Sequence, residues 1–366
     1  MRKLIRVAVT VLAAGSLVLA ACGDDSDDKG SGDTSGGDSG GAKIGVILPD
    51  SKSSARWETA DRKFLDEAIA GAGFEAVIQN AEGDKQKMAT IADSMIAQGV
   101  KVLMIVNLDS ESGATILKKA KDAGIKTIDY DRLTLGGGAD VYISFDNVAV
   151  GKLQGEGLTK CLDEKGTAKP KVAVLNGSPT DNNATLFKEG YDGVINKKFD
   201  SGEWTEVDDQ SVPDWDNQKG GQIFEQMLAT AGGSVDGVLA ANDGLGGAAI
   251  AVLQKNGLKV PVTGQDATVE GLRNILTGDQ CMTVYKAIKV EADAAADAAI
   301  ALASGEEPET NGEVEDTETG KMVESVLATP VAIFKDNVKD VIADGFVAQD
   351  EVCEGLEAEC ADAGIE

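Results

Sequence analysis

Six places along the chain combine a short apolar segment with amide, carboxylate or cationic residues shortly after it. These polar residues are Asp131-Arg132, Asp146-Asn147, Asp181-Asn182-Asn183, Asn242-Asp243, Gln265-Asp266 and Lys286. One such group is ordinary, because Asp or Asn often caps the helix that follows a strand. Six together favour a ligand that carries many hydroxyl groups. A hydroxyl both donates and accepts, so carboxylates mixed with amides and cations can bind each one twice.

The sparse aromatic residues point to the same kind of ligand. Trp57 follows Arg56 shortly after the first apolar segment, and Trp215 lies in the loop-like sequence Pro213-Asp214-Trp215-Asp216. A loop tryptophan most often packs against its neighbours, but its indole can also stack on the C–H face of a sugar ring. A hydroxyl-binding set beside such a face favours a monosaccharide.

Composition excludes several other functions. The 366 residues include no histidine, which excludes Ser-His-Asp and Cys-His catalysis and the zinc sites that need histidine. The 62 acidic residues outnumber the 34 basic ones, and the net charge of −28 argues against nucleic acid as a partner. Neither a Gly-x-x-x-x-Gly-Lys-Ser/Thr loop nor a Gly-x-Gly-x-x-Gly after a strand is present. We expect no cofactor and no metal.

The apolar segments alternate with longer stretches of helical spacing. In one of these, Met88, Ile91, Ala92 and Met95 form a single helical stripe. The expected strands are 44–48, 75–79, 102–106, 127–130, 141–145, 171–175, 235–240, 260–263 and 282–285. Strands without polar alternation, each followed by a helix, predict an α/β fold with parallel sheets covered on both faces. At this length the fold should divide into two such domains.

Taken in order, the segments resemble the periplasmic sugar-binding proteins of the ribose/galactose type, and within them the D-xylose-binding proteins of ABC importers. The resemblance is carried by Leu48-Pro49-Asp50, Arg56-Trp57, Tyr130-Asp131-Arg132, Tyr142-Ile143-Ser144-Phe145-Asp146-Asn147, Gly177-Ser178-Pro179, Asp181-Asn182-Asn183-Ala184, Asn242-Asp243, Gly264-Gln265-Asp266-Ala267 and Met282-Thr283-Val284-Tyr285-Lys286. Single segments are weakly specific. The ordered set, which runs from about residue 43 to 350, is highly specific.

The resemblance implies a type I periplasmic binding protein fold, in which two Rossmann-like lobes with parallel sheets are joined by a three-crossover hinge. The expected parts are a signal peptide (1–22), a tether (23–42), a first lobe (43–145 with about 267–305), a second lobe (146–266 with about 306–345) and a tail (346–366). The chain departs from the family in its acidic 305–320 segment and in its C-terminal extension, which contains cysteines.

The implied function is binding of a neutral monosaccharide between the lobes, followed by delivery to the permease of an ABC transporter. D-xylose is the leading sugar, and another aldopyranose is the next. The protein is expected to be a monomer and not an enzyme. A sugar sensor that presents its ligand to a membrane receptor is an alternative. A carbohydrate-active enzyme with paired carboxylates is an alternative of another class.

Carried over residue by residue, the resemblance implies sugar contacts at Arg56, Asp131, Arg132, Asp181, Asn183, Trp215, Asn242, Asp266 and Lys286. Trp57 is a possible further stacking face, and Asp146 and Asn147 mark the hinge. Three carboxylates among these residues can accept from hydroxyls, and three cations can donate to them. Their balance suits an uncharged sugar better than a sugar acid. Salt bridging between the lobes is the alternative role for these charges.

The first 22 residues have the features of a lipoprotein signal peptide. A basic start precedes an apolar run too short for a bilayer span, and Leu19-Ala20-Ala21-Cys22 resembles a lipobox. We expect Cys22 to be lipidated and the exported protein to be anchored to the outer face of the cytoplasmic membrane through this lipid only. An ordinary secretory signal with a chance cysteine would also lead to export. Residues 23–42 are mainly Gly, Ser and Asp, which predicts a disordered tether.

Four cysteines remain after Cys22, and an even number in an oxidising compartment favours disulfides. We predict that Cys353 and Cys360 pair, because Gly355 lets the short stretch between them fold back. Cys161 and Cys281 are expected in different lobes. Free thiols are therefore favoured for them, although their pairing remains open.

Overall fold

The computed structural model describes residues 41–365. The expected signal peptide, Cys22 and nearly all of the expected tether lie outside these residues. Within the described part of the chain, none of the helices is long and apolar enough to cross a membrane.

The first lobe is built on a seven-stranded sheet with the order β10-β11-β5-β4-β3-β1-β2. Its strands are β1 (Lys43–Leu48), β2 (Glu75–Asn80), β3 (Val102–Ile105), β4 (Lys126–Tyr130), β5 (Val141–Phe145), β10 (Gly312–Asp316) and β11 (Lys321–Ala328). All neighbouring strands are parallel except β10, which pairs antiparallel with β11. The near-continuous apolar character of the central strands is typical of a sheet that is covered on both faces.

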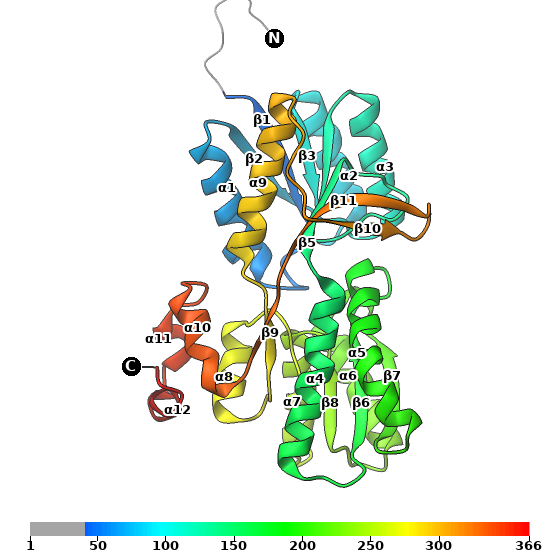
Figure 1. Ribbon diagram of the computed structural model, residues 1–366, viewed down its shortest axis with the longest axis vertical. Helices are drawn as coiled ribbons and strands as arrows, with labels where there is room; N and C mark the ends of the chain where they lie inside the picture. Colours follow the sequence, from blue (N-terminus) through cyan, green and yellow to red (C-terminus); the bar gives the residue numbers. More distant parts are fainter. Residues whose placement is uncertain (1–40, 366) are drawn as a thin grey trace, which may run out of the picture. The chain divides into compact units, whose positions relative to one another are not determined.

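Helices cover both faces of this sheet. A helical turn (η1, Trp57–Asp61) leads into α1 (Arg62–Gly71), which packs with α9 (Ile288–Ser304) against one face. The other face is covered by α2 (Lys85–Ala97) and α3 (Ser110–Asp122). The carboxyl ends of β1, β4 and β5 therefore remain free to present residues to the second lobe (Figure 1).

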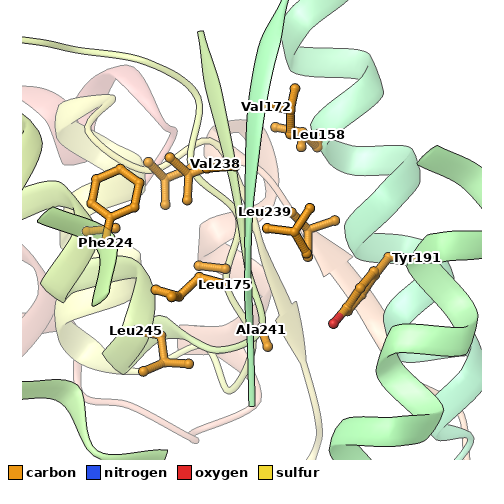
Figure 2. Close-up of a cluster of buried hydrophobic side chains, with 14 of the residues drawn as sticks. Leu158, Val172, Leu175, Tyr191, Phe224, Val238, Leu239, Ala241 and Leu245 are labelled. Atoms are coloured by element: carbon orange, nitrogen blue, oxygen red, sulfur yellow. The ribbon is translucent and has the colours of Figure 1, made fainter. Parts of the chain in front are cut away.

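The second lobe has a three-stranded parallel sheet with the order β7-β6-β8. Its strands and main helices are α4 (Asn147–Lys165), β6 (Lys171–Asn176), α5 (Asn182–Asp200), β7 (Thr205–Ser211), α6 (Asn217–Thr230), β8 (Gly237–Ala240), α7 (Asp243–Lys255) and α8 (Val269–Thr277). In the core, Leu158 and Tyr191 of α4 and α5 lie on one side of β6, and Phe224 and Leu245 of α6 and α7 lie on the other (Figure 2).

Close packing of α4 against α5 depends on glycine. A Cβ added at Gly151 would lie 1.9 Å from the carbonyl oxygen of Phe187, so only glycine lets the two helices approach this closely. This contact fixes the start of α5, which carries Asn183 and Phe187.

The chain passes between the lobes at three places (Figure 1). The first runs from β5 into α4, the second from β9 (Thr283–Tyr285) into α9, and the third from β11 into β12 (Val331–Ile333). Strands β9 and β12 pair antiparallel and form a small sheet of their own. The architecture is the type I periplasmic binding protein fold that the resemblance implied.

The lobe boundaries differ from the expected ones in two segments. Residues 267–286 were expected in the first lobe, but α8 packs on α7 and β9 pairs with β12 in the second. Residues 312–328 were expected in the second lobe, but β11 pairs in parallel with β5 and extends the first sheet. Both differences arise because pairing between strands distant in sequence decides which lobe a segment joins, and local pattern does not report that pairing.

The C-terminal segment 338–365, which includes the described part of the expected tail, packs on the second lobe. It contains α10 (Val338–Ala343), α11 (Gln349–Cys353) and α12 (Glu357–Asp362), and its apolar residues share a core with Leu272 and Ile275 of α8. The hydroxyl of Tyr285 donates to Asp344 at 2.5 Å, and its ring lies 5.2 Å from that of Phe346. The extension is thus a folded part of the second lobe.

Both remaining cysteine pairs are disulfides. Cys353 and Cys360 are bonded, with 6.0 Å between their Cα atoms, which is the pairing expected from the sequence. Cys161 and Cys281 are also bonded, with Cα atoms 6.5 Å apart, so the expectation of free thiols was wrong. It rested on placing Cys281 in the first lobe, whereas the segment before β9 lies beside α4 in the second.

Candidate functional site

A small cavity of about 30 Å³ lies between the two lobes, well below the usual volume of a small-molecule site. All the expected contact residues line it: Arg56, Asp131, Arg132, Asp181, Asn183, Trp215, Asn242, Asp266 and Lys286, together with Trp57. Four residues outside the expected contact set complete the lining, namely Ser53, Ser54, Phe187 and Gln265. The sugar-contact set derived from the sequence is therefore assembled around one cavity.

Strand ends and helix starts position these side chains. Asp131 directly follows β4, and Lys286 directly follows β9. Asp181 caps α5 by accepting from the backbone N–H of Asn183 at 2.9 Å, and Asn242 caps α7 by accepting from that of Leu245 at 2.9 Å. Capping and cavity lining are thus combined in the same side chains, because the helices begin where the ligand cavity lies.

Arg56 is held by three carboxylates. Its Nη1 donates to Asp131 Oδ2 at 2.8 Å, and its Nη2 donates to Asp61 Oδ1 at 2.7 Å and to Glu291 Oε2 at 2.6 Å. Its Nε donates to Asp61 Oδ2 at 2.9 Å, and its guanidinium lies 4.4 Å from the centre of the Trp57 ring. Burial alone would lower the pKa of Arg56, but these carboxylates outweigh it and raise the pKa well above its ordinary value. The arginine is a fixed, charged donor.

Asp131 is the carboxylate nearest to the centre of the charged network. Burial alone would raise its pKa, but the charges of Lys286, Arg56 and Arg132 outweigh burial and lower the pKa to about 2. Its backbone has φ +60°, a left-handed conformation that few non-glycine residues adopt. Three side chains, from Tyr142, Ser144 and Asn183, lie within hydrogen-bond distance of its backbone carbonyl. The site therefore keeps this aspartate ionised and fixed in direction.

A chain of polar contacts links the lobes across the cavity. Arg132 of the first lobe approaches Asp181 of the second with 3.0 Å between Nε and Oδ2. The same carboxylate oxygen accepts from the indole N–H of Trp215 at 3.0 Å. The interlobe salt bridge considered as an alternative role is thus present, and it involves residues that also line the cavity.

The indole ring of Trp215 packs against Gly177 and Phe187. A Cβ added at Gly177 would lie 2.0 Å from the indole ring, so this position needs glycine. Phe187 meets the same ring edge to face, with 6.4 Å between the ring centres. Trp215 itself has φ +54°, a strained conformation of the kind that is often found at binding sites.

Several polar groups of the cavity have hydrogen-bonding capacity left for a ligand. Lys286 is only 3% exposed, and its ammonium lies 3.6 Å from Asp131 and 3.7 Å from Asp266, beyond good hydrogen-bond distance. The Oε1 atom of Gln265 is buried and has no hydrogen-bond partner within the described residues. Asp266, at φ +97°, accepts from Ser54 across the lobes at a long 3.3 Å. Buried polar groups are normally satisfied, so these atoms are suited to binding a ligand.

Asn183 has a more restricted role than the sequence predicted. Its side-chain nitrogen donates to the carbonyl of Asp131 at 2.8 Å and to its Oδ1 at 3.1 Å. Its Oδ1 accepts from Asn147 at 3.0 Å. Both amide hydrogens are therefore used between the lobes, and Asn183 can meet a ligand only as an acceptor or by contact.

The expected hinge residues lie at the first crossing. Asp146 caps α4 by accepting from the backbone N–H of Ala149 at 2.9 Å, and its own N–H donates to Ala328 at the third crossing at 3.0 Å. The amide of Asn147 lies within hydrogen-bond distance of Tyr142 and Ser144 as well as Asn183. Both residues connect segments that pass between the lobes.

Three buried carboxyl groups lie behind the cavity, and two of them, Asp61 and Glu291, were not singled out from the sequence. Asp61, the last residue of η1, and Glu291 of α9 bind Arg56, as described above. Asp243 accepts from the backbone N–H of Thr268 and from the side chains of Gln280 and Thr283, each at 2.8 Å. It thereby ties down the loop that carries Asp266, and burial raises its pKa to about 7. An acidic residue on an apolar helical stripe was the signal for Glu291, which shares its face with Ile288, Ala292 and Ala295.

Comparison with known proteins agrees with this geometry. Residues 44–307 match the model of the periplasmic binding protein domain. The chain is 36% identical over 313 residues to the D-xylose-binding periplasmic protein of Escherichia coli, covering 85% of this chain and 92% of the relative. It is 33% identical to the multiple sugar-binding periplasmic receptor ChvE of Rhizobium radiobacter, covering 82% of this chain and 89% of the relative.

A solved structure with the same fold is similar over nearly its whole length. It is the carbohydrate transporter solute-binding protein of Chloroflexus aurantiacus in complex with D-glucose. The two share 28% identity with a TM-score of 0.78, over 84% of this chain and 97% of the other. From the family match and the extent of these similarities, the chain belongs to the periplasmic binding protein family.

Proposed function

We propose that this protein captures a neutral monosaccharide in the cavity between its lobes and delivers it to the permease of an ABC importer. D-xylose is the first candidate ligand, and another aldopyranose is the next. The protein binds its sugar without changing it and acts as a monomer that holds one sugar per chain.

The observation that carries this proposal is the ring of charged and amide groups around one small cavity. Three carboxylates (Asp131, Asp181 and Asp266) face three cations (Arg56, Arg132 and Lys286). This balance favours an uncharged ligand, because a sugar acid would add a negative charge without a free cation to meet it. The mixture of donors and acceptors, beside the rings of Trp57, Trp215 and Phe187, fits a molecule with hydroxyls around an apolar ring face.

D-xylose is favoured by the relatives. Two D-xylose-binding periplasmic proteins, from Escherichia coli and Haemophilus influenzae, are each 36% identical over 313 residues. The multiple sugar-binding relative and the solved glucose complex support the wider class of aldopyranoses.

Isothermal titration calorimetry over a panel of neutral monosaccharides tests this function. We expect D-xylose or another aldopyranose to bind one per chain, and xylonate, which carries a carboxylate, to bind much more weakly. Each bound sugar should also raise the melting temperature, because it binds only the native state. Failure of every neutral sugar to bind, or tighter binding of xylonate, would contradict the proposal.

We further propose that Cys22 is the lipidated first residue of the mature protein and anchors it outside the cytoplasmic membrane. The support is the sequence Leu19-Ala20-Ala21-Cys22 after a basic and apolar segment. Replacing Cys22 by Ala should release the protein from the membrane fraction or block its processing. Unchanged membrane association of the variant would contradict the anchor.

A further inference from the structure

Arg56 lies between the cavity and a buried acidic pair that the ligand cannot reach. A guanidinium carries five N–H groups. Two are used by Asp61, one by Glu291 and one by Asp131. The fifth, on Nη1, has no acceptor among the described residues, and Arg56 lines the cavity. The three carboxylates thus determine which single N–H of Arg56 is available to a sugar.

Glu291 is the member of this set that comes from the most distant part of the chain. It lies 235 residues after Arg56, in the first turn of α9, and its side chain is fully buried. Only its Oε2 atom is engaged, by Arg56, whereas its Oε1 atom has no hydrogen-bond partner in the described part of the chain. A buried acid that binds nothing except a ligand-site arginine has its clearest use in holding that arginine.

On this basis, and resting on the proposed sugar-binding function, we propose that Glu291 is a positioning residue that orients Arg56 toward the sugar and makes sugar affinity depend on pH. Glu291 does not line the cavity, so it acts through Arg56. Glu291 contacts Arg56 on the side away from the cavity, because α9 packs on α1 and η1 and brings Glu291 next to Arg56.

The charges that face Glu291 determine the direction of this pH dependence. They are Arg56, Asp61 and Asp131 from the first lobe and Lys286 at the second crossing, and the hydroxyls of Tyr130 and Tyr142 lie in the same network. With Glu291 protonated, the negative charges of Asp61 and Asp131 balance the positive charges of Arg56 and Lys286 in the set that faces Glu291. When Glu291 ionises, the network gains an uncompensated negative charge next to a cavity that the sugar seals from water. Sealing a net charge away from water is unfavourable, so affinity falls.

Burial of Glu291 supports a transition near neutral pH. Its pKa is raised by burial, against the opposing effect of Arg56, to about 8. The wild-type protein should therefore bind sugar most tightly below this pH and lose affinity, by about threefold or more, between pH 7 and pH 9.

Calorimetry with D-xylose across this pH range, on three variants, tests the inference. Glu291→Gln keeps an oxygen that can accept from Arg56 but cannot ionise, so it should bind like wild type at pH 6.5 and stay constant to pH 9. Glu291→Leu removes the acceptor and should bind about tenfold more weakly at pH 6.5. Asp297→Asn removes one exposed charge from the same helix and should keep the wild-type pH profile.

The outcomes separate this inference from the proposed function. Parallel pH profiles for wild type and Glu291→Gln, or full affinity in a folded Glu291→Leu protein, would overturn the role of Glu291 alone. Thermal melting of each variant establishes that it is folded. A wild-type protein that binds no monosaccharide at any pH would overturn the proposed function and this inference together.

Discussion

The charged residues around the cavity hold one another in place. Arg56 is fixed by Asp61, Glu291 and Asp131, and Arg132 is fixed by Asp181. Such preorganisation lowers the entropy lost on binding, because few side chains must be ordered by the ligand. Asp266 is less tied down, with one long hydrogen bond from Ser54 and the Lys286 ammonium at 3.7 Å. It is therefore the carboxylate with the most capacity for a sugar hydroxyl.

Replacing Asp266 by Asn is expected to weaken sugar binding about tenfold or more. The change removes a charged acceptor, and hydrogen bonds to charged groups contribute about 1.5–3 kcal/mol. Asp236→Asn is the matched control, because Asp236 accepts from the backbone of Lys171 at the opposite end of β6, away from the cavity. Calorimetry should find the control unchanged, and equal affinities for Asp266→Asn and wild type would contradict the role given to Asp266.

At this scale the sequence predicted the residues that line the cavity better than those behind them. Asp131 and Lys286 follow strands, and their position at strand ends could be derived from local pattern. The strand expected at 260–263, before Asp266, is only an isolated bridge between Val238 and Val262. Glu291 reaches Arg56 only because α9 returns to the first lobe after the chain has passed through most of the second lobe. No local sequence pattern shows that α9 comes close to Arg56. The one local sign of Glu291, a glutamate on an apolar helical stripe, does not identify Arg56 as its partner.

Elements with a strong apolar pattern were predicted, and those without one were missed. The strands β1, β4 and β5 are buried throughout or nearly so, and their expected positions agree with the structure. Strand β7 reads Thr-Glu-Val-Asp-Asp-Gln-Ser and lies at the edge of its sheet, half-exposed along its length. An edge strand buries little apolar surface, so its sequence carries little of the strand pattern.

The two disulfides should contribute unequally to stability. In the chain-entropy model the stabilisation grows with the length of the closed loop, and it amounts to about 5 kcal/mol for Cys161–Cys281 and about 2 kcal/mol for Cys353–Cys360. The sequence separations behind these figures are 120 and 7 residues. Urea denaturation of the two Cys-to-Ser double variants should give a clearly lower midpoint for the Cys161/Cys281 pair. The reverse order would show that the tail disulfide stabilises through something other than loop closure.

At the scale of the whole molecule, the ligand cavity is shared by parts that belong to different lobes. Arg56 and Asp131 come from the first lobe, whereas Trp215 and Asp266 come from the second. Direct contacts such as Arg132–Asp181 also join the lobes. A sugar that binds both sides adds to these contacts and shifts the lobes toward the closed arrangement.

We therefore expect small-angle X-ray scattering to give a smaller radius of gyration at saturating sugar than without it. The motion would occur about the three crossings, with Asp146 and Asn147 as hinge residues at the first. Asp266→Asn, measured at a sugar concentration that saturates only wild type, provides the control and should show little change. Identical wild-type profiles with and without sugar would contradict closure by the ligand.

Neither lobe is encoded by one continuous stretch of the gene. A fragment that ends at Phe145 would lack α9 and the β10–β11 hairpin, so the apolar face that α9 covers would be open to water and prone to aggregate. A fragment that starts at Asn147 and ends at Lys286 would lack β12, the partner of β9, and the tail that covers α8. An isolated first lobe would have to be made as a spliced gene, in which a designed linker joins residues 41–145 to residues 288–328.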